Sequence, residues 1–348
     1  MKKKINLVIM AILLLILVSG CGSYKDYRQY LKDYKEFQEY KAYKESLLIP
    51  ETIADTITKP SDDSVSSNDI TEPTVSLQGE PQTVSGSDLI KIADLLVERN
   101  EVYNWENSYE KTMKINELDR QILTLGNYDF SNITADFVGD SITEGVGGNV
   151  DSNGIKLSYV NYVQDLLRFK EVINMGKAGR MIASHNNPEL SIEVNETSLI
   201  NLNAQTIVIY AGINDFLCED ELKIYGELDS GSTSGYCGQL QSFTKSLENN
   251  YPEKDFFFVT SYQILTTDSS VYKDFEGTPT LNDYMEPQRI LAERYGYRVI
   301  ELYNTGFMSM NGKGNEYFFK DTIHPNIEGY RVLGEHIAAE ILLYYLGF

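Results

Sequence analysis

Histidine, cysteine and tryptophan are scarce in this chain: its 348 residues include three His, three Cys and one Trp. So few and scattered His and Cys residues do not make a cluster of metal ligands, and we expect no metal site and no cofactor. Basic residues are also outnumbered, because 30 Lys and Arg stand against 51 Asp and Glu, with a formal net charge of −21. Contact with phosphate is driven by basic charge, so the chain is not expected to bind nucleic acid.

The first 21 residues contain no acidic side chain and carry one apolar run. Lysines at positions 2–4 precede the stretch from Ile5 to Val18, which is too short, and too soon followed by small residues, for an ordinary membrane span. This arrangement is typical of an export signal. The tetrapeptide Val-Ser-Gly-Cys that ends at Cys21 resembles the lipobox of bacterial lipoproteins.

That resemblance implies that residues 1–20 are a signal peptide and that Cys21 becomes the lipidated first residue. The protein would then be held by its lipid at the extracytoplasmic face of the cell membrane. The alternatives are an uncleaved anchor helix and an ordinary secretory signal with a chance cysteine. Cys218 and Cys237 would remain in a compartment where disulfides survive, and the sequence leaves open whether they form a bridge or two buried thiols.

Two segments separate this signal from the rest of the chain. Residues 21–48 are predicted to hold the lipid anchor and a Tyr-rich helical stalk, since apolar or aromatic residues recur at 24, 27, 30, 34, 37, 40, 43 and 47. Their mean step of about 3.3 residues falls short of a coiled-coil seam, so a stalk is favoured over oligomerisation and the oligomeric state stays open. Residues 49–86 are rich in Pro, Ser, Thr, Asp and Glu, which predicts a disordered linker.

Residues 87–131 show helical periodicity. The spacing predicts one helix that starts near Ser87 as its N-cap and a second helix from Lys111 to Leu125. We expect this helical segment to pack on the domain that follows. A separate helical hairpin is the alternative.

From residue 132 onward, short apolar runs alternate with amphipathic segments. The expected strands are Ala135–Val138, Glu171–Met175, Thr206–Tyr210, Asp255–Thr260 and Arg298–Leu302. The expected helices are Ser158–Phe169, Gly238–Asn250, Asn282–Tyr295 and Ile327–Leu346. Strands separated by helices imply crossover connections, so residues 132–348 are predicted to form a three-layer α/β/α domain with a mostly parallel five-stranded sheet. Ligands of such sheets bind beyond the carboxyl ends of the strands.

Three of these strands end in segments that can support chemistry. The first leads into Gly139-Asp140-Ser141, where a serine on a tight turn before a helix would present its hydroxyl. The second leads to Gly179, whose N–H can donate to a bound group, and the third into Gly212-Ile213-Asn214-Asp215, whose Asn amide can stabilise an oxyanion. Taken singly, each segment also has a purely structural explanation: Ser141 as part of a helix N-cap, Gly179 as part of a turn, and Asn214 as part of an Asx-turn.

A fourth segment, Asp321-Thr322-Ile323-His324, precedes the last expected helix. Within one local turn, Asp321 could hold the Nδ1–H of His324 and leave Nε2 free as a base. Of the other histidines, His336 is expected to pack or to lie at the surface, and His185 has no obvious partner. Lys177 and Arg180 lie near the predicted site, where solvated loop charges are favoured over contacts with an acidic sugar.

Together and in this order, the four segments resemble the motif blocks of the SGNH, or GDSL-type, hydrolase superfamily, over residues from about 132 to 348. The resemblance implies a flavodoxin-like fold and a carboxylic ester hydrolase that needs no metal. It implies Ser141 as nucleophile, His324 as base and Asp321 as the group that orients the imidazole. The oxyanion hole would consist of the Ser141 N–H, the Gly179 N–H and the Asn214 side chain.

The predicted export narrows the choice of ester, because an anchored, outward-facing esterase meets envelope polymers and incoming carbohydrate. We therefore expect removal of O-acetyl groups from a carbohydrate or cell-envelope polysaccharide through an acyl-enzyme. The alternatives are a lipase, lysophospholipase or thioesterase that acts on longer acyl chains, and a non-catalytic surface binding protein that keeps the fold. Transfer of acyl groups to a sugar is a further possibility.

Overall fold

The computed structural model describes residues 84–152, 154–183, 188–217, 225–264, 279–307 and 315–348. The predicted signal peptide 1–20, the stalk 21–48 and nearly all of the linker 49–86 lie outside these residues, as do Cys21, His185 and Cys218. Within the described residues, no helix is both long enough and apolar enough to cross a membrane. Lipidation of Cys21 and the amino-terminal segments therefore stay predictions.

A five-stranded sheet lies at the centre of the described domain, with strand order β2-β1-β3-β4-β5 and parallel pairing throughout. The strands are β1 (Thr134–Gly139), β2 (Glu171–Gly176), β3 (Thr206–Tyr210), β4 (Asp255–Val259) and β5 (Arg298–Ile300). Every residue of β1 and β3 is buried, as expected for inner strands covered on both faces, whereas the edge strand β2 is partly exposed. The predicted three-layer fold is confirmed.

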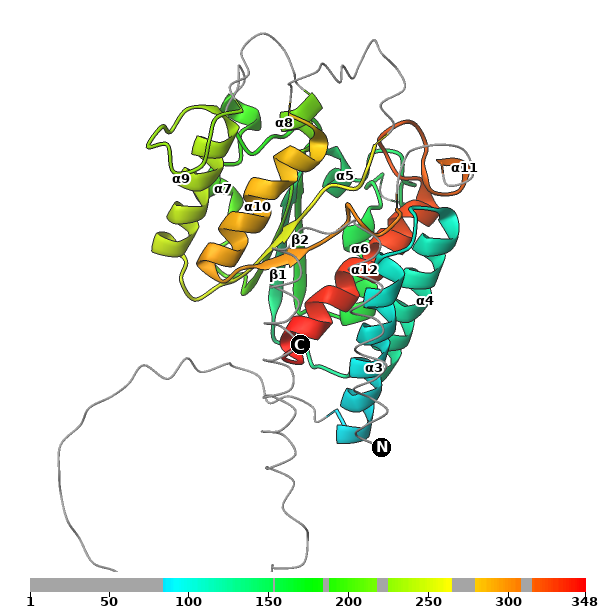
Figure 1. The fold of residues 1–348 in the computed structure, drawn as a ribbon. Coiled ribbons are helices and arrows are strands. Elements are labelled where there is room, and N and C mark those ends of the chain that lie inside the picture. The colour runs from blue at the N-terminus through cyan, green and yellow to red at the C-terminus, as the bar shows by residue number, and fades with distance from the viewer. Residues whose placement is uncertain (1–83, 153, 184–187, 218–224, 265–278, 308–314) are drawn as a thin grey trace, which may run out of the picture. The chain divides into compact units, whose positions relative to one another are not determined.

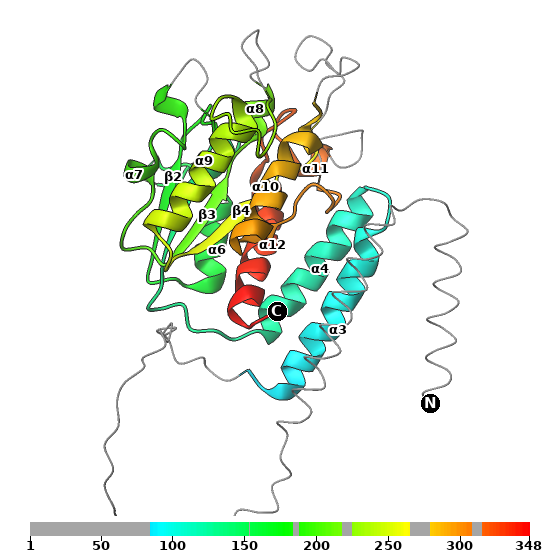
Figure 2. The ribbon, with the colours of Figure 1, turned by 60° about the vertical axis from the view of Figure 1, so that its left-hand side comes forward.

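Helices cover both faces of this sheet, as Figures 1 and 2 show. On one side lie α7 (Glu196–Leu199), α9 (Gly235–Asn250) and α10 (Leu281–Tyr295), and on the other lie α6 (Tyr159–Leu167) and α12 (Ile327–Tyr345). The short elements are α5 (Ser141–Glu144), η1 (Pro188–Leu190), α8 (Ile213–Leu217) and α11 (Asn315–Phe318). One continuous core of buried apolar side chains runs through both layers of helices and the sheet.

The predicted elements of this domain are all present, with shifted ends. Strands β4 and β5 stop at Val259 and Ile300, one and two residues earlier than expected, and α9 begins at Gly235, three residues earlier than expected. Sequence periodicity did not indicate these four short elements or the four-residue helix α7, because three to five residues are too few to show a helical repeat.

Two helices precede the sheet, α3 (Gly86–Tyr103) and α4 (Tyr109–Leu125), and both contact the last helix of the chain. The expected N-cap at Ser87 is wrong, because the side chain of Ser85 accepts the N–H of Asp88 and starts the helix two residues earlier. Apolar side chains of α3, such as Ile92, pack with Leu343 near the end of α12.

A buried ionic cluster of Arg99, Asp119, His336, Glu340 and Arg298 joins α3, α4, α12 and β5. Arg99 bonds to Asp119 over 2.6 Å and also to Glu340, while Glu340 bonds to Arg298 over 3.1 Å. His336 Nδ1 lies 2.7 Å from Asp119 Oδ2. Because the two members of each ion pair come from different helices or strands, this cluster ties the amino-terminal helical pair to the sheet domain.

Candidate active site

Ser141 lies directly after the inner strand β1 and starts helix α5. The carboxylate of Asp140 accepts the N–H of Ile142 over 2.8 Å and caps this short helix. A Cβ atom at Gly139 would lie 2.1 Å from Thr143 Oγ1 and 2.5 Å from Tyr210 O, so only glycine permits so tight a turn. The chain therefore presents the Ser141 hydroxyl at the carboxyl edge of the sheet.

Asp321 and His324 share one tight turn in the segment that precedes α12. Oxygen Oδ1 of Asp321 accepts the backbone N–H groups of Ile323 and His324, over 2.8 and 2.7 Å. From outside the turn, the Tyr262 hydroxyl donates to Ile323 O over 2.5 Å. These bonds hold the turn in place independently of the contact between Asp321 and the imidazole.

The turn brings His324 to Ser141, although 183 residues separate them. His324 Nε2 lies 3.0 Å from Ser141 Oγ, and His324 Nδ1 lies 2.9 Å from Asp321 Oδ2. An ionised carboxylate only accepts hydrogen bonds, so Nδ1 carries the proton and Nε2 is free to accept from the serine. Partial burial disfavours the charge of Asp321, but hydrogen bonds from His324 and Ile323 outweigh it and hold the pKa of Asp321 below its ordinary value.

The predicted oxyanion hole has two backbone donors, the N–H groups of Ser141 and Gly179. Gly179 has φ +79°, a left-handed conformation that favours glycine. In the described part of the chain, no hydrogen bond occupies the N–H of Ser141 or that of Gly179. The Asn214 amide donates to Arg180 O over 2.9 Å, which uses one of its two hydrogens and leaves the other for a bound oxygen.

Two acidic side chains to which we had assigned no role brace the loop around Gly179. Asp215, fully buried, accepts the N–H groups of Ile182 and Ala183 over 2.8 and 2.9 Å. Glu144 accepts the N–H of Ala178 over 2.6 Å. Asp215 was visible in its motif, but its partners lie more than 30 residues away, and no sequence signal connects them.

The expectation for Arg180 as a solvated loop charge is wrong, because its side chain is only 8% exposed and donates to the carbonyl of Met175. Lys177 is exposed, as expected. Asp140 is fully buried, and this burial, together with the nearby carboxylate of Asp215, raises the pKa of Asp140 to about 7 against the opposing effects of the Ile142 N–H and Arg180. A buried cation and a buried acid therefore lie behind the nucleophile.

The remaining sequence candidates lie away from this site. His336 belongs to the buried ionic cluster, so of the two expectations for this residue, the packed position is confirmed and the surface position is wrong. Cys237 is buried with a free thiol, and its proposed partner Cys218 lies outside the described residues. Among the described side chains, no group of three or more His, Cys, Asp or Glu is arranged to hold a metal ion.

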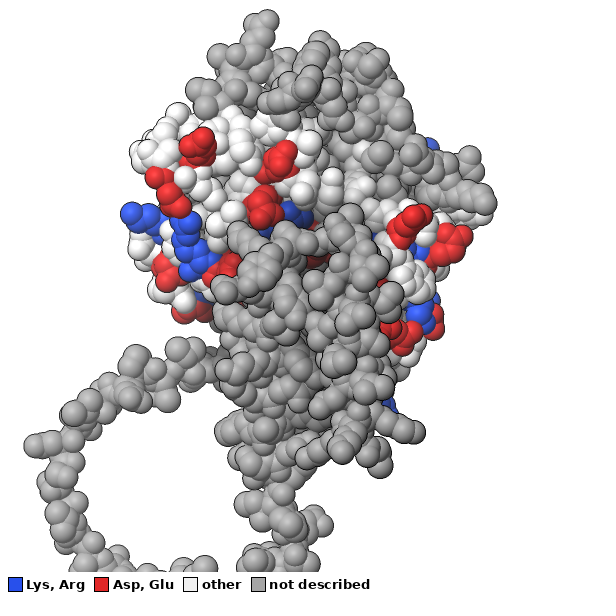
Figure 3. All heavy atoms as spheres, in the orientation of Figure 1, with Lys and Arg blue, Asp and Glu red and all other residues white. Residues whose placement is uncertain are grey.

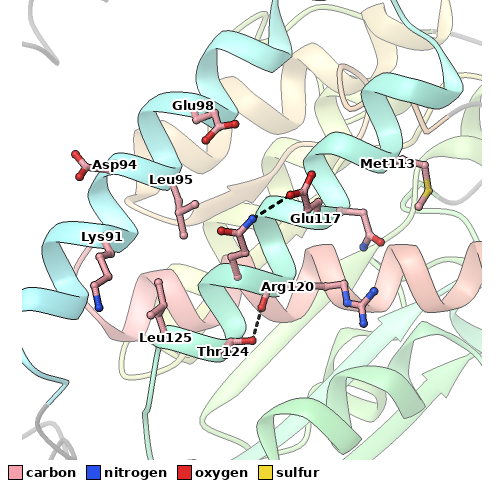
Figure 4. A pocket seen from close by; sticks show the side chains of 11 residues that line it. Lys91, Asp94, Leu95, Glu98, Met113, Glu117, Arg120, Thr124 and Leu125 are labelled. Carbon is pink, nitrogen blue, oxygen red and sulfur yellow. Dashed lines mark hydrogen bonds between the residues drawn. The ribbon is translucent and has the colours of Figure 1, made fainter.

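A groove of about 1040 Å³ runs between α3 and α4 (Figure 4). Its lining residues are Lys91, Asp94, Leu95, Glu98, Met113, Asn116, Glu117, Arg120, Gln121, Thr124 and Leu125. This lining holds no Ser, Cys or His, so the groove has no serine–histidine pair like that of Ser141 and His324.

On the face drawn in Figure 3, acidic and basic side chains are interspersed over the visible part of the described surface.

Comparisons with known proteins found one family and several solved structures to which this chain is similar. The model of the GDSL-like lipase/acylhydrolase family matches residues 137–332. A solved structure from Lactobacillus plantarum is 21% identical, with a TM-score of 0.50, and the match covers 64% of this chain and 100% of that one. A lipase/acylhydrolase from Enterococcus faecalis is 18% identical, with a TM-score of 0.44 and coverage of 60% and 95%. A variant of an acetyl xylan esterase from Geobacillus stearothermophilus is 19% identical, with a TM-score of 0.42 and coverage of 60% and 94%. The comparison with curated proteins gave no match.

Proposed function

The chain belongs to the GDSL-like lipase/acylhydrolase family and is an ester hydrolase, and from this premise we propose that Ser141, His324 and Asp321 carry out the hydrolysis. The observation that carries the proposal is the continuous line of contacts from Asp321 Oδ2 through the imidazole to Ser141 Oγ. Four separate segments of the chain supply these atoms and the neighbouring amide donors.

In the first half of the reaction, Ser141 Oγ attacks the ester carbonyl while His324 Nε2 takes the hydroxyl proton. Asp321 keeps the imidazole in the required tautomer and favours its charged form. The carbonyl oxygen becomes an oxyanion that the Ser141 N–H, the Gly179 N–H and the Asn214 amide stabilise. His324 then returns the proton to the departing alcohol, and an acyl-enzyme remains.

In the second half, water attacks the acyl-enzyme and His324 removes its proton. The tetrahedral intermediate uses the same three donors. Its collapse breaks the bond to Ser141 Oγ, releases the carboxylic acid and returns the proton to the serine. The braces on the loop of Gly179 support this cycle, because donors that are already fixed need no reorganisation when charge develops.

We propose further that the ester is an O-acetyl group on a carbohydrate or cell-envelope polysaccharide, and that Cys21 anchors the enzyme by its lipid outside the cytoplasm. The predicted export signal supports both steps, since it directs the enzyme to a compartment rich in acylated polymers. Replacement of Cys21 by Ala should release the protein from the membrane fraction and abolish labelling by a fatty-acid probe. Unchanged labelling would refute the anchor.

The test of activity measures acetate release from acetylated glycans by the purified protein, with Ser141→Ala as the matched control. We expect release by the wild type and none above background by the variant. A fluorophosphonate probe should label the wild type at Ser141 and not the variant. Folded wild-type protein that neither labels nor hydrolyses an ester would instead favour a surface binding protein.

Acyl length is tested separately with p-nitrophenyl esters. Faster hydrolysis of the acetyl than of the octanoyl ester supports the deacetylase proposal. The reverse order would assign the enzyme to longer acyl chains, as a lipase, lysophospholipase or thioesterase.

A further inference from the structure

Arg180 is a buried cation on the loop that carries an oxyanion donor. Its side chain is 8% exposed, its guanidinium donates to Met175 O at the end of β2, and its own carbonyl accepts the Asn214 amide. Burial of a guanidinium is costly unless an anion lies nearby. Burial lowers the pKa of Arg180, and the nearby carboxylates of Asp140 and Glu144 oppose this shift. No carboxylate of the described residues forms an ion pair within 4.0 Å of it.

The sheet register shows that the guanidinium of Arg180 lies close to Asp140. In the sheet, Met175 pairs with Val138 and Gly176 pairs with Gly139, the last residue of β1. A guanidinium bonded to Met175 O therefore lies at the edge of the sheet where β1 ends and Asp140 follows. The Lys177 N–H donates to Gly139 O over 3.0 Å and continues this contact beyond the strands. The loop of Arg180 and the turn of Ser141 are thus neighbours along their length.

Both charged groups have an unused polar atom. Within the described residues, Asp140 Oδ2 and Arg180 Nε are buried and have no hydrogen-bond partner. Asp140 is fully buried and directly precedes the nucleophile. The titratable or charged groups that face Asp140 are Asp215, Arg180, Tyr159, Tyr210, Tyr262 and Tyr330. Arg180 is the one cation in this set.

We propose that Arg180 is a positioning residue that acts through Asp140: its cation balances the buried carboxylate behind Ser141. The inference rests on the proposed function, because it concerns the charge beside the developing oxyanion. An unbalanced carboxylate next to that oxyanion would repel it, while a protonated one would be a weaker cap for α5. Arg180 acts against both states at once, without touching the substrate.

A double-mutant cycle in the full-length chain tests this pairing. The variants are Arg180→Gln, Asp140→Asn and the combination of both, with kcat and KM measured on p-nitrophenyl acetate. Asn is as good an N-cap as Asp, so Asp140→Asn removes the charge and keeps the cap. Lys177→Gln, a neutralised exposed cation of the same loop, is the matched control and should change kcat less than about twofold.

We expect Arg180→Gln to lower kcat by about 10- to 100-fold with little change in KM, and Asp140→Asn to lower it less. The double variant should recover most of the activity lost in Arg180→Gln, because no charge is left to balance. Arg180→Lys, which keeps the charge, should lose less than Arg180→Gln. If Arg180 were only structural, the double variant would not recover activity and Arg180→Lys would not keep more activity than Arg180→Gln.

Two outcomes overturn the pairing. If the losses of the single variants multiply in the double variant, or if Arg180→Gln keeps full activity, Arg180 does not act through Asp140. Should Arg180→Gln be folded but too unstable for kinetics, the same cycle is measured as the melting temperature, and a double variant no more stable than Arg180→Gln overturns the pairing equally. A folded but inactive wild type would overturn the proposed function and this inference with it, whereas an active wild type with independent losses overturns this inference alone.

Discussion

Two Asp–His pairs occur among the described residues, and their nitrogen–oxygen distances are nearly the same. In the candidate active site, His324 Nδ1 lies 2.9 Å from Asp321 Oδ2, and in the ionic cluster, His336 Nδ1 lies 2.7 Å from Asp119 Oδ2. The first pair lies three residues apart in one turn, whereas 217 residues separate the members of the second.

What differs is the surroundings of the other ring nitrogen. His324 Nε2 faces the hydroxyl of Ser141, and the side chains of His324 and Asp321 are 20% and 51% exposed. His336 Nε2 is buried and has no partner among the described residues, and the side chains of its pair are 5% and 0% exposed. An Asp–His pair can therefore support catalysis only where the imidazole Nε2 contacts a reactive group that substrate can reach. Elsewhere, as at His336, the pair holds helices together.

The largest expected effect separates the two histidines by activity. His324→Ala should lower kcat by about 10⁴-fold or more, because the serine loses its base, and should leave the melting temperature nearly unchanged. His336→Gln should leave kcat within about twofold of the wild type and lower the free energy of unfolding by about 1–3 kcal/mol. Ester hydrolysis and thermal unfolding of both variants check this prediction, which fails if His336→Gln is the less active of the two.

The next effect concerns the carboxylates. Asp119→Ala should lower the free energy of unfolding by about 3–5 kcal/mol, since it leaves Arg99 and His336 buried without their shared anion. Asp94→Ala, an exposed position on α3, should change it by less than about 0.5 kcal/mol. Denaturant titration gives both values. Equal stability of the two variants would show that the cluster does not hold the helical pair in place.

Asn214→Ala sharpens the catalytic side of the comparison. Loss of one oxyanion donor should lower kcat by about 10²- to 10³-fold in a protein that folds normally. The control is Asn203→Ala, an exposed asparagine, which should retain full activity. Equal activity of Asn214→Ala and the wild type would exclude the proposed oxyanion hole.

The smallest expected effect is on the pH dependence of stability. Burial opposes the charge of His336, but Asp119 and Glu340 outweigh it and raise its pKa above 6.5. Stabilisation by this pair is therefore complete below pH 6.5 and is lost as the pH rises through the raised pKa. Burial also opposes the charge of Glu340, but Arg99 and Arg298 lower its pKa to about 2, so its contribution is lost only as the pH falls toward that value.

Unfolding of the wild type and of His336→Gln at pH 6 and pH 8 measures the histidine contribution. The wild type should be the more stable protein at pH 6, and its advantage should shrink at pH 8. An advantage that grows with pH would show that the histidine is buried in its neutral form.

The candidate active site at the end of the sheet could be located from sequence because each of its features is local. The glycines, the serine turn and the Asp321–His324 turn are each set within a few residues, and the alternation of strands and helices predicts that they meet at one edge. The ionic cluster could not be predicted in this way. Arg99 and Glu340 lie 241 residues apart, and a lone charge on an otherwise apolar helix face carries no mark of its partner.

The same limit applies to Arg180. Its position in a loop favours solvent exposure on sequence grounds, yet its side chain is buried and donates to Met175 O in the neighbouring strand β2. The short helix α8 and the braces from Asp215 and Glu144 likewise depend on contacts between distant loops. Periodicity thus predicts the layers, and the four motif segments predict the candidate chemistry, but neither predicts the side chains that hold these groups in place.

The two ends of the described domain lie together, at the edge of the sheet opposite the helix α5 (Figure 1). Side chains near the start of α3 share an apolar cluster with Leu343 and Phe348 at the end of α12. A fluorescent fusion or a solid support attached at the carboxyl terminus would therefore leave the Ser141 side facing outward. Bulky or insoluble polymers could then be offered to an immobilised sample without the attachment point standing in their way.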